Sequence, residues 1–143
     1  MAGMDWWSVV TALVLHLGPD GQWARVLTGL DHARSQAFAT GDPSRLADVY
    51  VPGGEAVDAA TIAAYERRGG RVVGVMTLES VRVVREIDDR VRLDVVDRLA
   101  RARVEWADGT VTDLPRDRPT RREVVLHRTD DGWRIAESRV RRP

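Results

Sequence analysis

The stretch from Val91 to Trp106, VRLDVVDRLARARVEW, constrains this chain most, because its apolar and polar residues alternate almost throughout. Alternation with period two is typical of a β-strand that buries one face. The pattern places Val91, Leu93 and Val95 on one face and then slips at Val95 and Val96. After the slip, the residues predicted to share a face are Arg98, Ala100, Ala102, Val104 and Trp106. A slip of this kind indicates a bulge, so we predict a long, bent strand at the centre of the domain.

Length and composition indicate one globular domain. A chain of 143 residues fits the usual size of a single domain. The 22 basic and 22 acidic residues leave no net charge to favour nucleic acid, and we expect no nucleic-acid partner. The absence of Cys excludes disulfides, thiolate metal sites and a Cys nucleophile. All basic residues are Arg and there is no Asn, a bias typical of a GC-rich bacterial genome.

Residues 1–21 are predicted to form a separate apolar N-terminal helix, ahead of one domain over residues 22–143. The apolar run from Trp6 to Leu17 is too short to span a bilayer and has no basic leading region or cleavage site. We therefore expect neither a signal peptide nor a transmembrane segment, and a cytoplasmic location. Such an apolar helix packs on its own domain, covers another subunit, or lies at a membrane surface.

Three helices are predicted in the first half of the domain. The first begins near Gln22, with Asp20 as its cap, and ends at Thr40 and Gly41. Its apolar face consists of Trp23, Val26, Leu27, Leu30, Ala33, Ala37 and Phe38. The side chains expected to point away from that face are Arg25, Asp31, Arg34 and Ser35. The other predicted helices cover residues 44–50, opened by Asp42 and Pro43, and about 55–68, ended by Gly69 and Gly70.

From Arg71 to the end, the period changes from helical to two. Turns are predicted at Asp88-Asp89, Asp108-Gly109 and Asp131-Gly132, and the first strand is expected to bend at Gly74 or at Glu79-Ser80. Helices followed by an antiparallel meander predict an α+β fold. We expect the N-terminal helices to pack in the concave face of a strongly curved antiparallel sheet.

Two strings resemble the NTF2-like superfamily, in particular its small SnoaL-like bacterial members. They are WARVLTGLDHARSQAFATGDPSRLADVY, from Trp23 to Tyr50, and DGWRIAE, from Asp131 to Glu137. The resemblance implies a cone in which a bent sheet wraps the helices and leaves an apolar pocket at its wide end. It also implies a homodimer through the outer sheet face, to which Trp106 or the Trp6-Trp7 segment would contribute. Members include ketosteroid isomerases, polyketide cyclases, epoxide hydrolases and many proteins without catalytic activity.

The chain departs from the enzymes of that superfamily. The segment that usually brings an acidic base to the pocket is shortened here to Val51-Pro52-Gly53-Gly54. Glu55 and Asp58 are then interpreted as first-turn and capping residues of the next helix. The hydrolase pattern of Asp, Arg and Asp assisted by Tyr and Asn is incomplete, because the chain has no Asn.

The candidate catalytic residues are Asp97 and Asp94 on the bent strand, with Tyr50 and Tyr65 from the helices. A carboxylate in an apolar pocket can transfer a proton at neutral pH, while a Tyr hydroxyl stabilises a developing oxyanion. The alternative is structural, with the Asp residues paired to neighbouring strands and both Tyr residues in the core. The side chains predicted to contact a ligand are Trp23, Leu27, Phe38, Tyr50, Tyr65, Arg98, Trp106, Trp133 and Glu137.

Other classes of site are not indicated. His16, His32 and His127 lie on different elements with no pair at ligand spacing, so no metal site is expected, and no cofactor. The sequence predicts a domain that binds a small apolar ligand or a protein partner without catalysis. The competing hypothesis is an isomerase, cyclase or epoxide hydrolase that uses a pocket carboxylate. A carboxylate facing an enclosed pocket, above all Asp97 beside a Tyr hydroxyl, would favour the enzyme.

Overall fold

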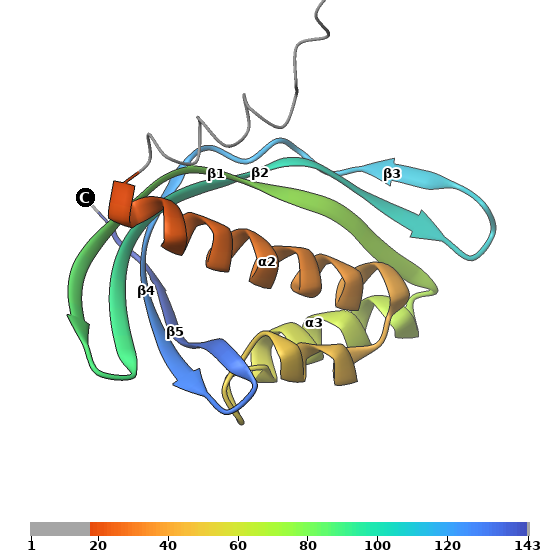
Figure 1. Cartoon of the computed structure of the whole chain (residues 1–143). Coiled ribbons are helices and arrows are strands. Elements are labelled where there is room, and N and C mark those ends of the chain that lie inside the picture. The colour runs from red at the N-terminus through yellow and green to blue at the C-terminus, as the bar shows by residue number, and fades with distance from the viewer. Residues whose placement is uncertain (1–17, 143) are drawn as a thin grey trace, which may run out of the picture.

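A strongly curved antiparallel sheet wraps around the helices in the computed structural model, which describes residues 18–142 (Figure 1). The helical elements come first and are α2 (Gly18–Thr40), the short 3-10 helix η1 (Pro43–Asp48) and α3 (Ala56–Arg67). The strands that follow are β1 (Gly70–Ile87), β2 (Arg90–Trp106), β3 (Val111–Asp113), β4 (Thr120–Thr129) and β5 (Gly132–Val140). The predicted α+β class and the order of helices before strands are confirmed.

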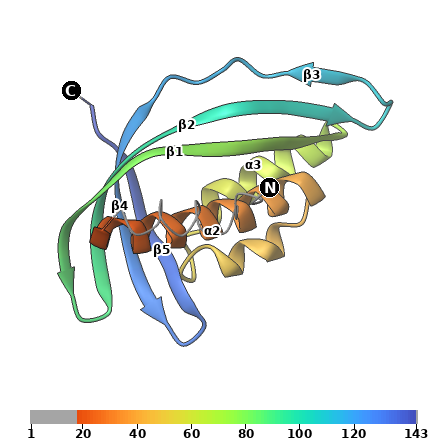
Figure 2. The same cartoon turned by 45° about the horizontal axis from the view of Figure 1, so that its top comes forward.

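The predicted bent strand is β2, which lies in the interior of the sheet. The strand order is β1-β2-β4-β5, and β3 pairs with the far end of β2. Val91, Leu93 and Val95 are buried on the inner face of β2, as the alternation predicts. Figures 1 and 2 show β1 and β2 arching over α2, with α3 on the opposite side of that helix. The sheet and helices therefore enclose a concave space.

The bulge in β2 lies later than predicted. Leu99 pairs with Met76 and Arg101 with Val75, so Ala100 is the extra residue, and the slip at Val95 and Val96 is wrong. Alternation runs unbroken from Val91 to Leu99, which puts Asp97 on the inner face.

Opposite the predicted slip, the irregularity is in β1. Leu78 pairs with Asp97 and Ser80 with Val96, which leaves Glu79 as the extra residue. The bend predicted at Glu79-Ser80 is therefore confirmed. Pairing between the two strands decides which of them carries an extra residue, and the pattern of one strand does not contain that information.

The helix α2 begins at Gly18, four residues before the predicted start. Pro19 fits in the first turn because the nitrogen atoms there need no intrahelical hydrogen-bond partner. The carboxylate of Asp20, predicted as a cap, instead accepts a hydrogen bond from the backbone nitrogen of Val83 at 3.3 Å. Residues 18–21 therefore belong to α2, and the helix predicted over Trp6 to Leu17 lies outside the described residues.

The core forms where the apolar stripe of α2 meets the sheet. Its buried members are Trp23, Leu27, Leu30, Val49, Val91, Leu93, Val95, Val124 and Leu126. Trp23 meets Trp133 of β5 edge to face, with ring centroids 4.8 Å apart. A second cluster, of Ala37, Leu46 and Ile62, joins α2, η1 and α3. No helix in the described part of the chain combines the length and the apolar character that crossing a membrane requires.

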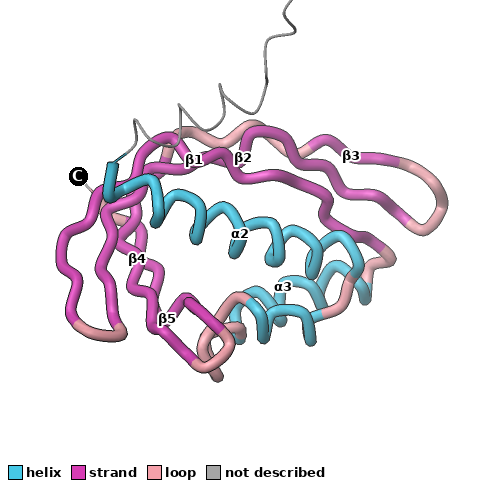
Figure 3. The backbone as a smooth tube through the Cα atoms, in the orientation of Figure 1, coloured by secondary structure: helices cyan, strands magenta, loops and turns pink. Residues whose placement is uncertain are grey.

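Short connections hold the helices against the sheet (Figure 3). Asp42 caps η1, as predicted, because its carboxylate accepts a hydrogen bond from the backbone nitrogen of Ser44 at 3.0 Å. Tyr50 then forms a parallel bridge with Ile135 of β5. Gly69 ends α3 at φ +77°, the left-handed conformation expected of that residue. These connections hold Tyr50 and α3 on the inner side of β5.

Truncation of a core valine tests the burial of β2. Val91 is 1% exposed, whereas Val111 of β3 is 54% exposed. We expect Val91→Ala to lower the free energy of unfolding by about 2 kcal/mol, because it loses apolar burial and leaves a cavity. Val111→Ala is the matched control and should change it by less than about 0.5 kcal/mol. Urea unfolding measures both, and equal effects of the two variants would contradict this packing.

Candidate functional site

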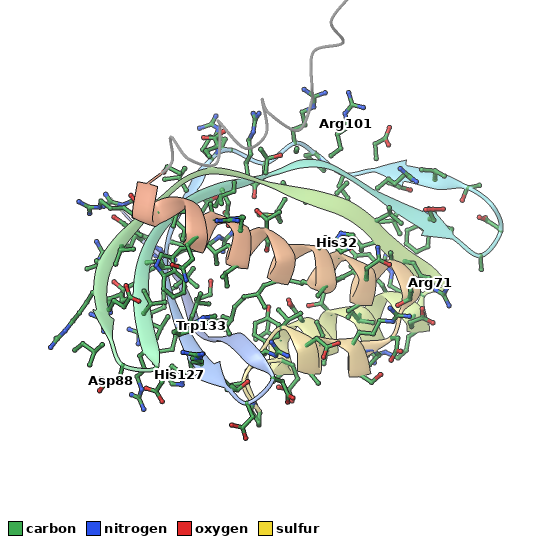
Figure 4. The ribbon with its side chains drawn as sticks, in the orientation of Figure 1. His32, Arg71, Asp88, Arg101, His127 and Trp133 are labelled. Carbon is green, nitrogen blue, oxygen red and sulfur yellow. The ribbon has the colours of Figure 1, made fainter. Side chains whose placement is uncertain are left out.

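A cavity of about 550 Å³ lies between α2, α3 and the inner face of the sheet. Most of its wall is apolar, and the wall includes Leu27, Phe38, Val57, Met76, Leu78, Val95, Leu99, Val124 and Ile135. Figure 4 shows the side chains between α2 and the strands, with Trp133 on the inner side of β5. Five charged side chains reach the cavity from α2, α3, β2 and β4, and they are Asp31, Arg34, Asp58, Asp97 and Arg122. Two further carboxylates, Asp117 and Glu137, line it from exposed positions.

The first charged pair joins α2 to α3. Arg34 holds the Asp58 carboxylate through two hydrogen bonds, Nε to Oδ2 at 2.6 Å and Nη2 to Oδ1 at 3.0 Å. The Tyr50 hydroxyl donates a further hydrogen bond to Oδ2 at 2.5 Å. Burial opposes ionisation of Asp58, but the hydrogen bonds and charge of Arg34 outweigh it and lower the pKa of Asp58. Asp58 is therefore ionised and fully engaged.

Tyr50 is held in its protonated form. Burial raises the pKa of the Tyr50 hydroxyl, and its hydrogen bond to Asp58 raises it further. Since that proton points at Asp58, the hydroxyl hydrogen is not available to stabilise an oxyanion in the cavity. The role predicted for Tyr50 as an electrophile would require it to leave Asp58.

The second charged pair joins β4 to β2. Arg122 Nε lies 2.9 Å from Asp97 Oδ1, and both side chains are largely buried. Asp97, a candidate catalytic residue, lines the cavity, but its carboxylate is paired with Arg122 and not with a Tyr hydroxyl. Of the two features that would favour an enzyme, the carboxylate facing the cavity is present, whereas a Tyr hydroxyl beside it is not.

Asp31 is a partly buried carboxylate of the cavity that has no side-chain partner among residues 18–142. It lies one turn before Arg34 on α2, and no side chain between residues 18 and 142 donates a hydrogen bond to it. Burial raises the pKa of Asp31 to about 6; the charges of Arg34 and Arg122 lower it, and that of Asp97 raises it. At neutral pH this carboxylate is mostly ionised, yet it can bind a proton under mildly acidic conditions.

The structure brings about half of the predicted site residues together. Five of them line the cavity, namely Leu27, Phe38, Tyr50, Asp97 and Glu137. The carboxylate of Glu137 is paired with Arg139, 3.2 Å away.

Asp94 points to the opposite face of the sheet from Asp97. Arg121 donates two hydrogen bonds to its carboxylate and Arg82 donates one. The hydrogen bonds from Arg121 are the main cause that lowers the pKa of Asp94 to about 2, although burial opposes the shift. As an acid–base group in the cavity, Asp94 is a wrong prediction, because it lies three positions before Asp97 on an unbroken strand, and an odd offset puts two side chains on opposite faces.

The remaining predicted ligand contacts lie outside the cavity wall. Trp23 and Trp133 pack on each other in the core. Arg98 is exposed on the outer face and pairs with Glu79 at 3.2 Å. Tyr65 and Trp106 lie beneath the Arg68 guanidinium, which is 5.8 Å from the Tyr65 ring centroid and 5.4 Å from that of Trp106.

Trp106 is also not an outer-face residue. Its ring lies where a side chain at Gly70 would be, since a Cβ built there would approach the ring to 2.7 Å. Its indole nitrogen donates to Thr112 at 2.8 Å. The expected contribution of Trp106 to an outer-face dimer is therefore wrong, and Trp6-Trp7 lies outside the described residues.

Sequence reasoning missed Asp31, Arg34, Asp58 and Arg122. Asp31 and Arg34 were expected to point away from the packed face of α2, and they do so, but into the cavity and not into bulk solvent. A signal for this exists, because Leu27, Asp31, Arg34 and Phe38 follow one another at helical spacing. A charged pair flanked by large apolar residues on one stripe indicates a face that is only partly solvated. Among the described residues, no three His, Asp or Glu side chains gather as a metal site.

Comparison with solved structures finds the same arrangement in other proteins. The intermembrane-space region of the chloroplast protein ARC6 aligns with a TM-score of 0.61 at 15% identity, covering 85% of this chain and 95% of that one. A nuclear transport factor 2 (NTF2-like) superfamily protein from Salmonella enterica aligns with a TM-score of 0.50 at 12% identity, covering 83% and 89%. This chain has an NTF2-like fold. The fold inferred from the sequence resemblance is therefore confirmed.

A third similar structure comes from Catenulispora acidiphila and was solved in complex with S-DNPA. It aligns with a TM-score of 0.52 at 19% identity, covering 83% of this chain and 91% of that one. No protein-family model matches the sequence, and no curated protein matches it significantly. At these identities the likeness concerns the NTF2-like fold, so the function must be argued from the cavity.

The raised pKa of Asp31 predicts a pH-dependent stability. Between about pH 4 and pH 6 the folded state binds a proton that the unfolded chain has released, so stability falls as pH rises through this range. We expect Asp31→Asn to raise the free energy of unfolding at pH 8 by roughly 1–3 kcal/mol, and by much less at pH 4.

Urea unfolding at both pH values measures this difference. Asp113→Asn, at an exposed position on β3, is the matched control and should show no such pH dependence. If both variants responded alike, Asp31 would not be the partly buried, unpaired carboxylate described above.

Proposed function

We propose that this NTF2-like domain binds a small, mainly apolar molecule in the cone cavity. The observation that carries the proposal is the cavity itself: about 550 Å³ of space remains between α2, α3 and the sheet. This volume falls within the range of about 300–1,000 Å³ that is usual for ligand pockets. A concave site of this size suits a small molecule better than the surface of a protein partner.

The character of the wall supports an apolar ligand. Large aliphatic and aromatic side chains from α2, β1, β2 and β5 make most of it. Arg34 and Arg122 each bind a carboxylate of the protein, so neither of them requires a polar group from the ligand. The C. acidiphila protein solved with S-DNPA supports ligand binding as a role that this fold can perform.

Binding of the neutral fluorophore N-phenyl-1-naphthylamine tests the proposal. We expect its fluorescence to rise on titration with the protein to a stoichiometry of one, because the cavity removes the probe from water. Leu99→Trp places a larger side chain on the cavity wall and should weaken binding about tenfold or more. Val111→Trp, at an exposed position on β3, is the control. Equal binding by both variants would show that the probe does not occupy the cavity.

A second candidate function is proton-transfer catalysis with Asp31 as the acid–base residue. The specific observation is that its carboxylate lines the cavity, has no hydrogen-bond donor among residues 18–142, and has a pKa of about 6. Such a group can accept a proton from an apolar substrate near neutral pH. Asp31 would thereby take the role predicted for Asp97, whose carboxylate is bound to Arg122. Tyr50 is the tyrosine among the described residues that lines the cavity, and its hydroxyl is bound to Asp58, which keeps this candidate second.

Hydrogen–deuterium exchange tests the catalytic candidate. We expect the protein to accelerate exchange of the α-protons of 2-tetralone, because ionised Asp31 would remove them. The acceleration should increase as pH rises through about 6 and should disappear in Asp31→Asn. NMR follows the exchange, with Asp113→Asn as the control. Unchanged acceleration in Asp31→Asn would eliminate this role for Asp31.

We also infer a homodimer, from the sequence resemblance alone. Trp106 no longer supports it, because its ring packs against Gly70. The surface proposed for it is the outer sheet face, where β1, β2, β4 and β5 turn one side away from the described helices.

A further inference from the structure

We infer that the ligand of this cavity is a small apolar amine whose ammonium group is bound by the Asp31 carboxylate. The inference rests on the proposed binding function and specifies its ligand class. It follows from the charges that face the cavity and from how they are already paired.

Among the cavity charges that are not exposed, all balance except that of Asp31; the exposed Glu137 pairs with Arg139, and the exposed Asp117 lies in the loop before β4. Arg34 and Asp58 form one neutral pair, with two hydrogen bonds between them. Arg122 and Asp97 form another, at 2.9 Å. Asp31 has neither a hydrogen bond nor a salt bridge to any residue from 18 to 142, so it leaves the wall with an excess negative charge.

An anionic ligand would have to compete with the protein for its arginines. The Arg34 guanidinium already uses Nε and Nη2 on Asp58, whose side chain is 11% exposed, and Arg122 uses Nε on Asp97, which is 12% exposed. Removing an arginine from a largely buried carboxylate leaves that charge uncompensated, which is strongly unfavourable. Each guanidinium keeps further N–H groups, but its charge is already balanced by a carboxylate, so an anionic ligand gains less here than at an unpaired arginine.

A cationic ligand meets the opposite situation. A buried carboxylate without a partner is destabilised, and an ammonium group placed beside it supplies both a charge and hydrogen-bond donors. Asp31 lies on the same stripe of α2 as Leu27 and Phe38, so an apolar body attached to the ammonium contacts the wall at the same time. The stripe thus presents Asp31 between apolar positions and beside Arg34, whose charge is balanced by Asp58.

Binding of an amine should then depend on pH. The charged groups that face Asp31 are Arg34 on its own helix, Asp97 on β2 and Arg122 on β4. Their opposing effects leave burial as the dominant cause of the raised pKa, and Asp31 takes up a proton near pH 6. Affinity for an ammonium group should fall below that pH, because the neutral carboxyl no longer attracts it.

Three ligands with the same ring system separate charge from apolar contact. They are 2-naphthylmethylamine, 2-naphthalenemethanol and 2-naphthoate, titrated by calorimetry at pH 7.5 and pH 5. At pH 7.5 we expect the amine to bind about tenfold or more tightly than the alcohol, and the carboxylate to bind weakest. At pH 5 the advantage of the amine over the alcohol should shrink, whereas the affinity of the alcohol should stay constant.

Variants assign the preference to Asp31. Asp31→Asn should bring the amine to the affinity of the alcohol without weakening the alcohol. Asp113→Asn removes an exposed carboxylate of β3 and should leave the tenfold preference intact. Circular dichroism and urea unfolding confirm that both variants are folded.

The outcomes distinguish the two proposals. If amine and alcohol bind equally, or if the amine keeps its advantage in Asp31→Asn, the amine inference is overturned while the apolar binding site remains. If 2-naphthoate binds tightest, an arginine and not Asp31 selects the ligand, and the inference is also overturned. If none of the three binds at millimolar concentration, the proposed binding function itself fails.

Discussion

The burial of α2 on two of its faces is the constraint on which the rest of this structure depends. One stripe, with Trp23, Leu27 and Leu30, packs into the core against β2 and β4. The neighbouring stripe, with Asp31 and Arg34, faces the cavity. A flat sheet would pack along the helix and close this space, but the bulges of β1 and β2 curve the sheet away from it. The cavity is thus a consequence of how the two long strands pair.

Paired charges allow this cavity to contain polar side chains. Each arginine pair joins two different elements, Arg34 of α2 to Asp58 of α3, and Arg122 of β4 to Asp97 of β2. Because a largely buried charge needs a partner, such pairs hold the elements at fixed separations as well as satisfying their own atoms. Asp31 has no such partner among residues 18–142, and burial raises its pKa. The candidate chemistry of the cavity therefore concentrates at one position.

Much of the fold follows from local patterns. The change of hydrophobic period near residue 70, the turns at Asp108-Gly109 and Asp131-Gly132, and the Asp42 cap all lie where the sequence predicts them. Each of these features depends on residues that are close together in the chain, so the local sequence is sufficient to predict it. The site was predicted less well, because Asp94 and Asp97 lie on opposite faces of the sheet. Only the pairing of the strands shows where a bulge interrupts the alternation of β2. Asp58 was correctly placed in a first helical turn but not in the cavity.

The sequence by itself determined the class of this protein: helices first, then a curved antiparallel sheet with an inner apolar face. Each of those properties comes from residues close together in the chain, whose spacing matches a helix or a strand. The tertiary structure alone decided which carboxylate stays unpaired. Arg34 reaches Asp58 across 24 positions and Arg122 reaches Asp97 across 25, so both acids are neutralised by distant residues. Among residues 18–142, the fold places no side chain where it could donate a hydrogen bond to Asp31, so this carboxylate stays unpaired.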